Sequence, residues 1–243
     1  MKIYAKTDIG RARETNQDSY YIEEGADSDF QVYILADGMG GYTGGEIASS
    51  LAVNSVKSYI NNNLKKIEYN RETIKQCIKE AIEYANMMVN EKANEDENIC
   101  EMGTTLDVVI IYDNRIYIGH VGDSRVYRIR KNIIRRLTTD HSYVEKLLRD
   151  GSITKEEAMN HPKKHMLIKV IGSNTFAEPD IIEKKIIEGD TILMCSDGLS
   201  NMLSEEEIFQ VIQEEEQNVA EALVEKANEM GGHDNITVIV IKV

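Results

Sequence analysis

Four aspartates stand beside apolar, strand-like runs of this 243-residue sequence. Asp37 and Asp197 each follow such a run and a small residue, and a glycine follows each of them. Asp123 comes shortly after the apolar run 115–121, and Asp234 comes just before the last apolar run. Short apolar runs are typical of buried strands. Carboxylates held on rigid strands, with no Cys or His cluster beside them, favour hard divalent cations such as Mg²⁺ or Mn²⁺.

The two Asp-Gly pairs also have a simpler interpretation. Asp-Gly is common in hairpin turns because both residues tolerate positive φ. Taken alone, Asp37-Gly38 or Asp197-Gly198 is better explained as a turn than as part of a metal site. The matching apolar frames of the two pairs, together with Asp123 and Asp234, leave turn and metal site as open alternatives.

The net charge of the chain limits the classes of partner that the protein is expected to bind. It carries 28 basic and 42 acidic residues, for a net charge of −14. Nucleic-acid binding needs a basic surface, so a nucleic-acid partner is not expected. An anionic membrane surface is disfavoured for the same reason. A phosphorylated substrate remains compatible with this charge, provided that metals and a placed arginine create positive potential locally.

The cysteines and the hydropathy pattern indicate a cytoplasmic protein. The three cysteines, Cys77, Cys100 and Cys195, are widely spaced and include no Cys-x-x-Cys pair, which argues against a disulfide framework and against zinc. The N-terminus lacks the apolar stretch that follows a basic start in an export signal. No apolar run approaches the ~18 residues of a membrane span, so membrane insertion is not expected.

The elements that must position the aspartates are predicted from periodicity and turn residues. Helices are expected over 45–61, 71–94, 142–149, 154–159, 204–215 and 218–230. Strands are expected over 2–9, 19–22, 31–36, 104–112, 115–121, 125–130, 133–137, 181–187, 191–196 and 236–243. Asp113-Asn114 and Lys131-Asn132 predict two-residue hairpins, and Ser204 with Glu207 predicts a capping box. Consecutive hairpins indicate antiparallel sheets in an α+β fold and exclude a Rossmann-type sheet.

No linker or repeat divides the chain, so one domain is expected over 1–243. Residues 138–178 are less apolar than their surroundings, and we expect them to form a mobile flap beside the site.

Seven motifs, in order along nearly the whole chain, resemble those of the metal-dependent protein serine/threonine phosphatases. This is the type 2C (PPM) family, in its compact bacterial form. The motifs are Arg13-x-x-Asn16-Gln17-Asp18, Ala36-Asp37-Gly38-Met39-Gly40-Gly41, Gly103-Thr104-Thr105, Gly122-Asp123-Ser124-Arg125, Leu137-Thr138-Thr139-Asp140-His141-Ser142, Ser196-Asp197-Gly198-Leu199 and Gly231-Gly232-His233-Asp234-Asn235-Ile236-Thr237. The resemblance implies a four-layer α-β-β-α sandwich of two antiparallel sheets flanked by helices.

The resemblance also implies a centre of two Mn²⁺ or Mg²⁺ ions that share a bridging water, the expected nucleophile. Asp37, Asp197 and Asp234 match the ligands of the first metal. Asp37 and the carbonyl of Gly38 match those of the second, with Asp18 nearby through water. Other matched positions complete the expected site: Asp123 with Asp197 for a third, weaker metal, Arg13 for the substrate phosphate, and Asn235 and His233 behind the ligands.

The general acid is not identified by the resemblance. Many eukaryotic members have a histidine directly after Asp-Gly, where this chain has Met39. Bacterial members often have a histidine a few residues later, where this chain has Tyr42. Water on a metal is therefore the expected proton donor.

The expected activity is hydrolysis of phosphoserine and phosphothreonine on proteins, by a monomer. By family analogy, the partners are a cognate bacterial Ser/Thr kinase and its substrates. Three alternatives remain: a phosphatase for one sporulation or sigma-factor regulator, a phosphopeptide-binding module without catalysis, and a metal-dependent phosphodiesterase acting on nucleotides.

Overall fold

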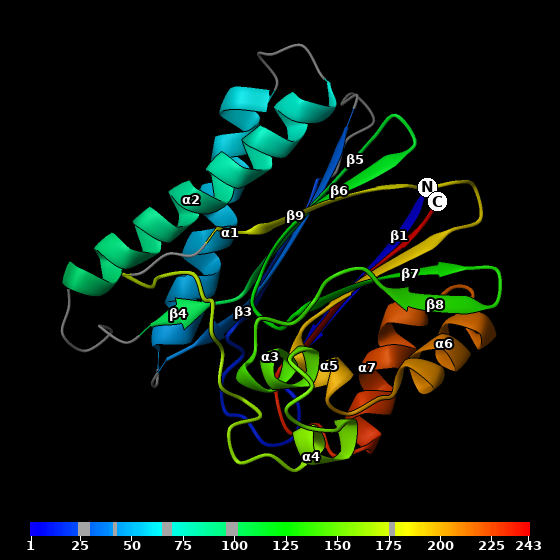
Figure 1. The fold of residues 1–243 in the computed structure, drawn as a ribbon. Coiled ribbons are helices and arrows are strands. Elements are labelled where there is room, and N and C mark those ends of the chain that lie inside the picture. The colour runs from blue at the N-terminus through cyan, green and yellow to red at the C-terminus, as the bar shows by residue number, and fades with distance from the viewer. Residues whose placement is uncertain (24–29, 41–42, 65–69, 96–101, 175–177) are drawn as a thin grey trace.

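Two antiparallel β-sheets lie face to face, and helices cover the outer face of each (Figure 1). The structure is a computed structural model that describes residues 1–23, 30–40, 43–64, 70–95, 102–174 and 178–243. The α+β fold and the α-β-β-α layering predicted from the sequence are confirmed.

One sheet has the strand order β1-β11-β10-β7-β8. Its strands are β1 (Lys2–Asp8), β7 (Arg125–Arg130), β8 (Ile133–Arg136), β10 (Thr191–Cys195) and β11 (Ile236–Lys242). The other has the order β2-β3-β5-β6-β9, with β4 paired to β3. Its strands are β2 (Asp18–Ile22), β3 (Gln31–Met39), β4 (Gly103–Thr104), β5 (Leu106–Tyr112), β6 (Arg115–Val121) and β9 (Asp180–Lys185).

The helices form two outer layers and a separate excursion. The helices are α1 (Gly44–Asn63), α2 (Arg71–Glu95), α3 (Tyr143–Arg149), α4 (Lys155–Met159), α5 (Asp197–Ser200), α6 (Glu205–Glu214) and α7 (Val219–Glu229). α1 and α2 pack on the β2–β9 sheet, and α6 and α7 pack on the β1–β8 sheet. α3 and α4 lie within the predicted flap, beyond one end of the sheets (Figure 1).

Three apolar layers hold the sandwich together. Ile34, Val108 and Ile110 contact the α1 and α2 side, while Tyr33, Leu35 and Val109 face the other sheet. This alternation is the period-2 pattern of strands that are buried on both faces. Cys77 and Cys195 are buried in these layers as free cysteines.

The predicted turns are confirmed. Asp113 and Asn114 have φ values of 47° and 56° between the paired strands β5 and β6. Asn and Asp are the residues that best tolerate this backbone conformation. Ser204 and Glu207 form the predicted capping box at the start of α6.

The surroundings of the two Asp-Gly pairs differ in part from the prediction. The strand that carries Asp37 is longer than predicted, because β3 continues to Met39, where it pairs with β4. Asp197 follows the end of β10, as predicted, and the helix α5 rather than a hairpin turn begins there. Neither β4 nor α5 is predicted by the periodicity, since each is too short to carry a periodic pattern.

Among the described residues, no helix combines the length and the apolar character that crossing a membrane would need.

Candidate metal centre

The fold gathers aspartates from separate chain segments at one end of the sandwich. Asp18 opens β2 and is the cross-strand partner of Asp37 in β3. Asp197 follows β10, and Asp234 precedes the neighbouring strand β11. Asp123 lies in the connection between β6 and β7, which joins the two sheets. The structure therefore draws together the carboxylates that the sequence placed in five different motifs.

Burial and mutual repulsion raise the pKa values of four carboxyl groups in the cluster, those of Asp18, Asp37, Asp123 and Asp197. Burial is the largest cause in each case. It raises the pKa of Asp18 and that of Asp123 to about 7, and that of Asp197 to about 6. The pKa of Asp37 lies well above its ordinary value, because the group is buried and also repelled by its four acidic neighbours. The four carboxyls thus form a concentrated negative site that lacks enough internal positive charge to balance it.

Glycines allow the backbone segments of the cluster to approach one another. A Cβ on Gly38 would lie 2.1 Å from the carbonyl oxygen of Gly45, and one on Gly198 would lie 2.0 Å from that of Asn235. Neither Gly38 nor Gly198 has a positive φ. The Asp-Gly pairs therefore need glycine for close backbone contact, not for a turn.

Threonines of the Gly103-Thr104-Thr105 motif brace Asp37. The backbone N–H of Asp37 donates to Thr105 Oγ1 (2.9 Å), and the N–H of Thr105 donates to the Asp37 carbonyl (2.8 Å). Thr104 Oγ1 also donates to that carbonyl (2.8 Å). Thr105 Oγ1 lies 2.8 Å from Ser124 Oγ, beside Asp123. The motif was recognised in the sequence, but no role for it followed from spacing alone.

Asn235 and Ser196 connect the ligand segments behind the cluster. Asn235 Oδ1 accepts from the N–H of Gln17 (2.8 Å), and its Nδ2 donates to the carbonyls of Ile9 and Thr15 (2.9 Å each). Ser196 Oγ donates to Asp18 Oδ2 (2.8 Å). Asn235 is buried, whereas His233 is exposed.

Arg13 reaches the cluster from the N-terminal segment. Its Nη2 donates to Asp234 Oδ2 at 2.7 Å, and this contact is the main reason why the pKa of Arg13 is raised. Asp197 and Asp37 raise it further by their charge. Arg13 remains half exposed, so its guanidinium lies between solvent and the carboxylates.

The donors of the cluster fit hard divalent cations. All are oxygens, and Asp18 Oδ1 is buried without a hydrogen-bond partner. In the described part of the chain, however, no three His, Cys, Asp or Glu side chains are arranged to hold an ion as they stand. The carboxylates instead face protein donors: Asp234 faces Arg13, Asp18 faces Ser196, and Asp197 accepts from Asn201 Nδ2 (3.0 Å). The fit therefore lies in donor chemistry and charge, and the side chains must turn to enclose a cation.

Two other observations concern the surroundings of the cluster. Met39 and Tyr42 occupy the positions where many family members have a histidine. Met39 is the last residue of β3, and Tyr42 lies outside the described residues. An open cavity of about 490 Å³ lies apart from the aspartates of the cluster; its lining is formed by Arg71, Asp113, Asn114, Arg115, Lys185, Ile186, Ile187 and Glu188. Charge, not cavity depth, distinguishes the acidic cluster.

Comparison with known proteins identifies close relatives. The family described as "Protein phosphatase 2C" matches residues 10–228. The "Serine/threonine phosphatase stp" of Listeria monocytogenes is 36% identical over 244 residues, which cover 100% of this chain and 96% of that protein. The solved S. agalactiae serine/threonine phosphatase is 37% identical with a TM-score of 0.90, covering 100% of this chain and 99% of its own. A solved catalytic domain of the phosphatase PstP, in complex with two manganese ions, is 30% identical with a TM-score of 0.80, covering 98% and 96%.

We predict that burial of the Asp37 carboxyl, together with repulsion in the cluster, makes Asp37→Asn more stable than the unsubstituted protein when EDTA is present. A carboxyl whose pKa is raised in the folded state binds its proton more tightly there than in the unfolded chain, so its contribution to stability is lost as pH rises through that pKa. The Tm difference should be small at pH 4.5 and should reach about 2–4 °C by pH 7.5. Calorimetry across this range measures it.

Asp113→Asn is the matched control, since it makes the same chemical change at an exposed turn. It should shift Tm equally at both pH values. A pH-independent Tm difference for Asp37→Asn would show that repulsion at Asp37 does not limit stability.

We predict that Thr105→Val lowers the free energy of unfolding by about 1–3 kcal/mol, because it leaves the buried N–H of Asp37 without an acceptor. Valine has nearly the same shape, so packing is kept. Thr105→Ser retains the hydroxyl that accepts from the N–H of Asp37. It should therefore lose less of the free energy of unfolding than Thr105→Val does. Urea unfolding compares the two, and a Thr105→Val variant as stable as the unsubstituted protein would show that the hydroxyl does not contribute.

Proposed function

Since this chain belongs to the protein phosphatase 2C family and is a protein serine/threonine phosphatase, we propose that its acidic cluster is the metal centre for hydrolysis of phosphoserine and phosphothreonine. Its cofactor is Mn²⁺ or Mg²⁺, and a solved relative holds two manganese ions. The proposal is carried by one observation. Buried carboxylates from separate segments converge, and burial and repulsion raise the pKa values of four of them.

We assign the ligands by the match of their motifs to those of the family. Asp37, Asp197 and Asp234 would hold one cation, and Asp37 with the Gly38 carbonyl would hold the second. Asp18, the cross-strand partner of Asp37, would act near the second cation through water. Asp123 and Asp197 provide for a weaker third cation, in keeping with the contribution of Asp197 to the raised pKa of Asp123.

The chemistry that bound divalent cations supply is activation of water at neutral pH and neutralisation of phosphate charge. The protein's own groups orient the substrate. Arg13 holds the phosphate, because its planar guanidinium can donate to two phosphate oxygens at once. It lies at the cluster and keeps half of its surface accessible to an incoming phosphoprotein. Asn235 and Ser196 keep the ligand segments in place from behind.

The biological setting belongs to the same proposal. The substrates are phosphorylated proteins. We place the enzyme in the cytoplasm, as a monomer whose 243 residues form one catalytic domain, with residues 138–178 as a flap. It opposes a cognate bacterial Ser/Thr kinase and acts on that kinase's substrates, and the net charge of −14 disfavours nucleic acid as a partner.

We predict that the protein hydrolyses a phosphothreonine peptide with Mn²⁺ and loses this activity in EDTA. Asp37→Asn should reduce turnover to the EDTA level, because Asp37 serves both cations, while Asp113→Asn should retain it. Phosphate release from the peptide measures the phosphatase activity, and chromatography of a cyclic dinucleotide detects opening of its phosphodiester ring. Turnover that survives EDTA would contradict the metal mechanism, turnover of the dinucleotide alone would favour a phosphodiesterase, and peptide binding without turnover would favour a binding module.

We predict that Arg13→Ala raises KM about ten- to hundredfold with a small effect on kcat, because it removes charge-assisted hydrogen bonds to bound phosphate. Arg13→Lys keeps the charge but loses the planar donor pair. Its KM should therefore lie between the KM of the unsubstituted protein and that of Arg13→Ala. Manganese affinity is measured alongside, because Arg13 also contacts Asp234. A loss confined to kcat would instead assign Arg13 to the transition state.

A further inference from the structure

The loop that carries Asp123 is held by a histidine of the predicted flap. The backbone N–H of His141 donates to the carbonyl of Gly122 (2.7 Å), and the N–H of Gly122 donates to His141 Nδ1 (3.2 Å). Gly122 has φ +116°, a conformation that favours glycine, and it immediately precedes Asp123. One residue thus fixes both backbone polar groups of the glycine that precedes Asp123.

These contacts require a particular form of the His141 ring. Nδ1 accepts from a backbone N–H, so it carries no proton, and the ring proton of the neutral form lies on Nε2. Nε2 lies 3.3 Å from Asp180 Oδ1, which Lys169 Nζ also contacts (3.1 Å). Burial, followed by the charges of His120 and Lys169, lowers the pKa of His141 to about 4. The neutral ring therefore agrees with the acceptor role of Nδ1.

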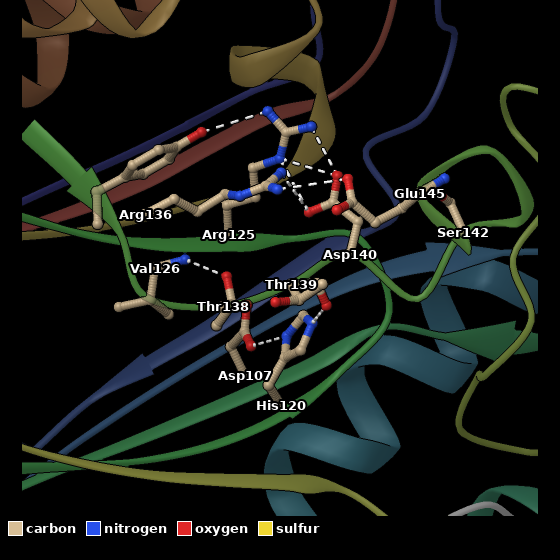
Figure 2. Close-up of polar contacts among 11 residues, drawn as sticks. Asp107, His120, Arg125, Val126, Arg136, Thr138, Thr139, Asp140, Ser142 and Glu145 are labelled. Carbon is tan, nitrogen blue, oxygen red and sulfur yellow. Dashed lines mark hydrogen bonds and ion pairs between the residues drawn. The ribbon is translucent and has the colours of Figure 1, made fainter. Parts of the chain in front are cut away.

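A second histidine holds the His141 ring from the core. The rings of His120 and His141 lie 4.7 Å apart, between centroids, and are inclined by 34°. His120 Nδ1 is 2.7 Å from Asp107 Oδ1, and Nε2 is 3.0 Å from the carbonyl oxygen of Thr139 (Figure 2). A carbonyl only accepts, so Nε2 carries a proton. Asp107 and His120 are fully buried and face each other across β5 and β6.

The residue between Thr139 and His141 is fixed as well. Asp140 accepts from Arg125 Nη2 at 2.7 Å and Nε at 3.0 Å, and from Arg136 Nη1 at 3.3 Å (Figure 2). Arg125 belongs to β7, two residues after Asp123. Each residue of the segment 139–141 is therefore bonded to β6, to β7 or to the connection between them that carries Asp123. These contacts make the segment a rigid support beside the cluster.

We propose that His141 is a positioning residue: supported by the Asp107–His120 pair, it fixes Gly122 and thereby aims the Asp123 carboxylate into the acidic cluster. This inference deepens the proposed function, on which it rests for the role of Asp123 as a cation ligand. It gives the buried Asp107–His120 pair a purpose that core packing does not require. An apolar pair would be cheaper to bury than an aspartate whose Oδ2 has no hydrogen-bond partner.

Two substitutions separate positioning from packing. The amide oxygen of His141→Asn can take the place of Nδ1 and accept from Gly122, whereas the longer side chain of His141→Gln places its amide near Nε2. Both lose the aromatic ring. In EDTA-treated protein, hydrogen exchange at the Gly122 amide, followed by NMR, should accelerate about tenfold in His141→Gln, in line with the loss of one hydrogen bond. It should stay within about threefold of the unsubstituted rate in His141→Asn. Equal rates in the two variants would overturn the proposal.

Manganese titration provides the functional readout. In His141→Gln the weakest Mn²⁺ site should lose about tenfold in affinity, as is usual when a group behind a ligand is removed, while the tighter sites are unchanged. His141→Asn should bind like the unsubstituted protein. An unchanged weak site in His141→Gln would overturn the proposal.

Failure of the proposed function gives a different result. If the unsubstituted protein binds no Mn²⁺, the metal assignment fails, yet Gly122 exchange in EDTA still tests the positioning. If a variant does not fold, the ¹⁵N signals of the histidine rings in the unsubstituted protein test the proposal instead. His141 should show an unprotonated Nδ1 and a protonated Nε2, and the reverse pattern would contradict the acceptor role.

Discussion

Electrostatic repulsion among buried carboxylates is the constraint on which the rest of this molecule depends. Asp18, Asp37, Asp123 and Asp197 lie in surroundings that penalise negative charge, and Asp18, Asp123 and Asp197 each raise the cost of ionising Asp37. No local propensity would gather them. The pairing of β2 with β3 and of β10 with β11 does so, and the three apolar layers stabilise that pairing. The free energy of the sandwich thus offsets a locally unfavourable site.

The groups around the cluster organise it without cancelling its charge. Thr105, Ser196 and Asn235 are neutral, and they satisfy backbone groups or single carboxylate oxygens. The nearby cation Arg125 is directed away, because Asp140 binds its guanidinium through two nitrogens. A neutralising Arg or Lys inside the cluster would relieve the repulsion and would also compete with any divalent cation. The negative charge is therefore kept available by the arrangement of the neighbouring hydrogen bonds.

The sequence predicted the layers and the candidate ligands better than it predicted how they are joined. Long apolar patterns such as 71–94 and 104–112 correspond to α2 and β5, because burial over many residues leaves a periodic trace. The two residues of β4 and the four of α5 leave none. Asp-Gly was ambiguous because glycine serves both turns and close approach, and only the contacts of Gly38 and Gly198 decide between them. The support formed by Asp107, His120 and His141 joins residues distant in sequence, so no spacing signals it.

The contact between Arg13 and Asp234 shows how an acidic protein can bind a phosphorylated substrate. Both oxygens of Asp234 are engaged, one by Arg13 (2.7 Å) and one by the N–H of Asn235 (2.9 Å). Under the proposed roles, Asp234 turns from Arg13 toward a cation, and this releases the guanidinium for a phosphate. The cation also reverses the local potential that would otherwise repel that phosphate. Cation binding and phosphate binding then favour each other through one ion pair, although the protein as a whole carries a net charge of −14.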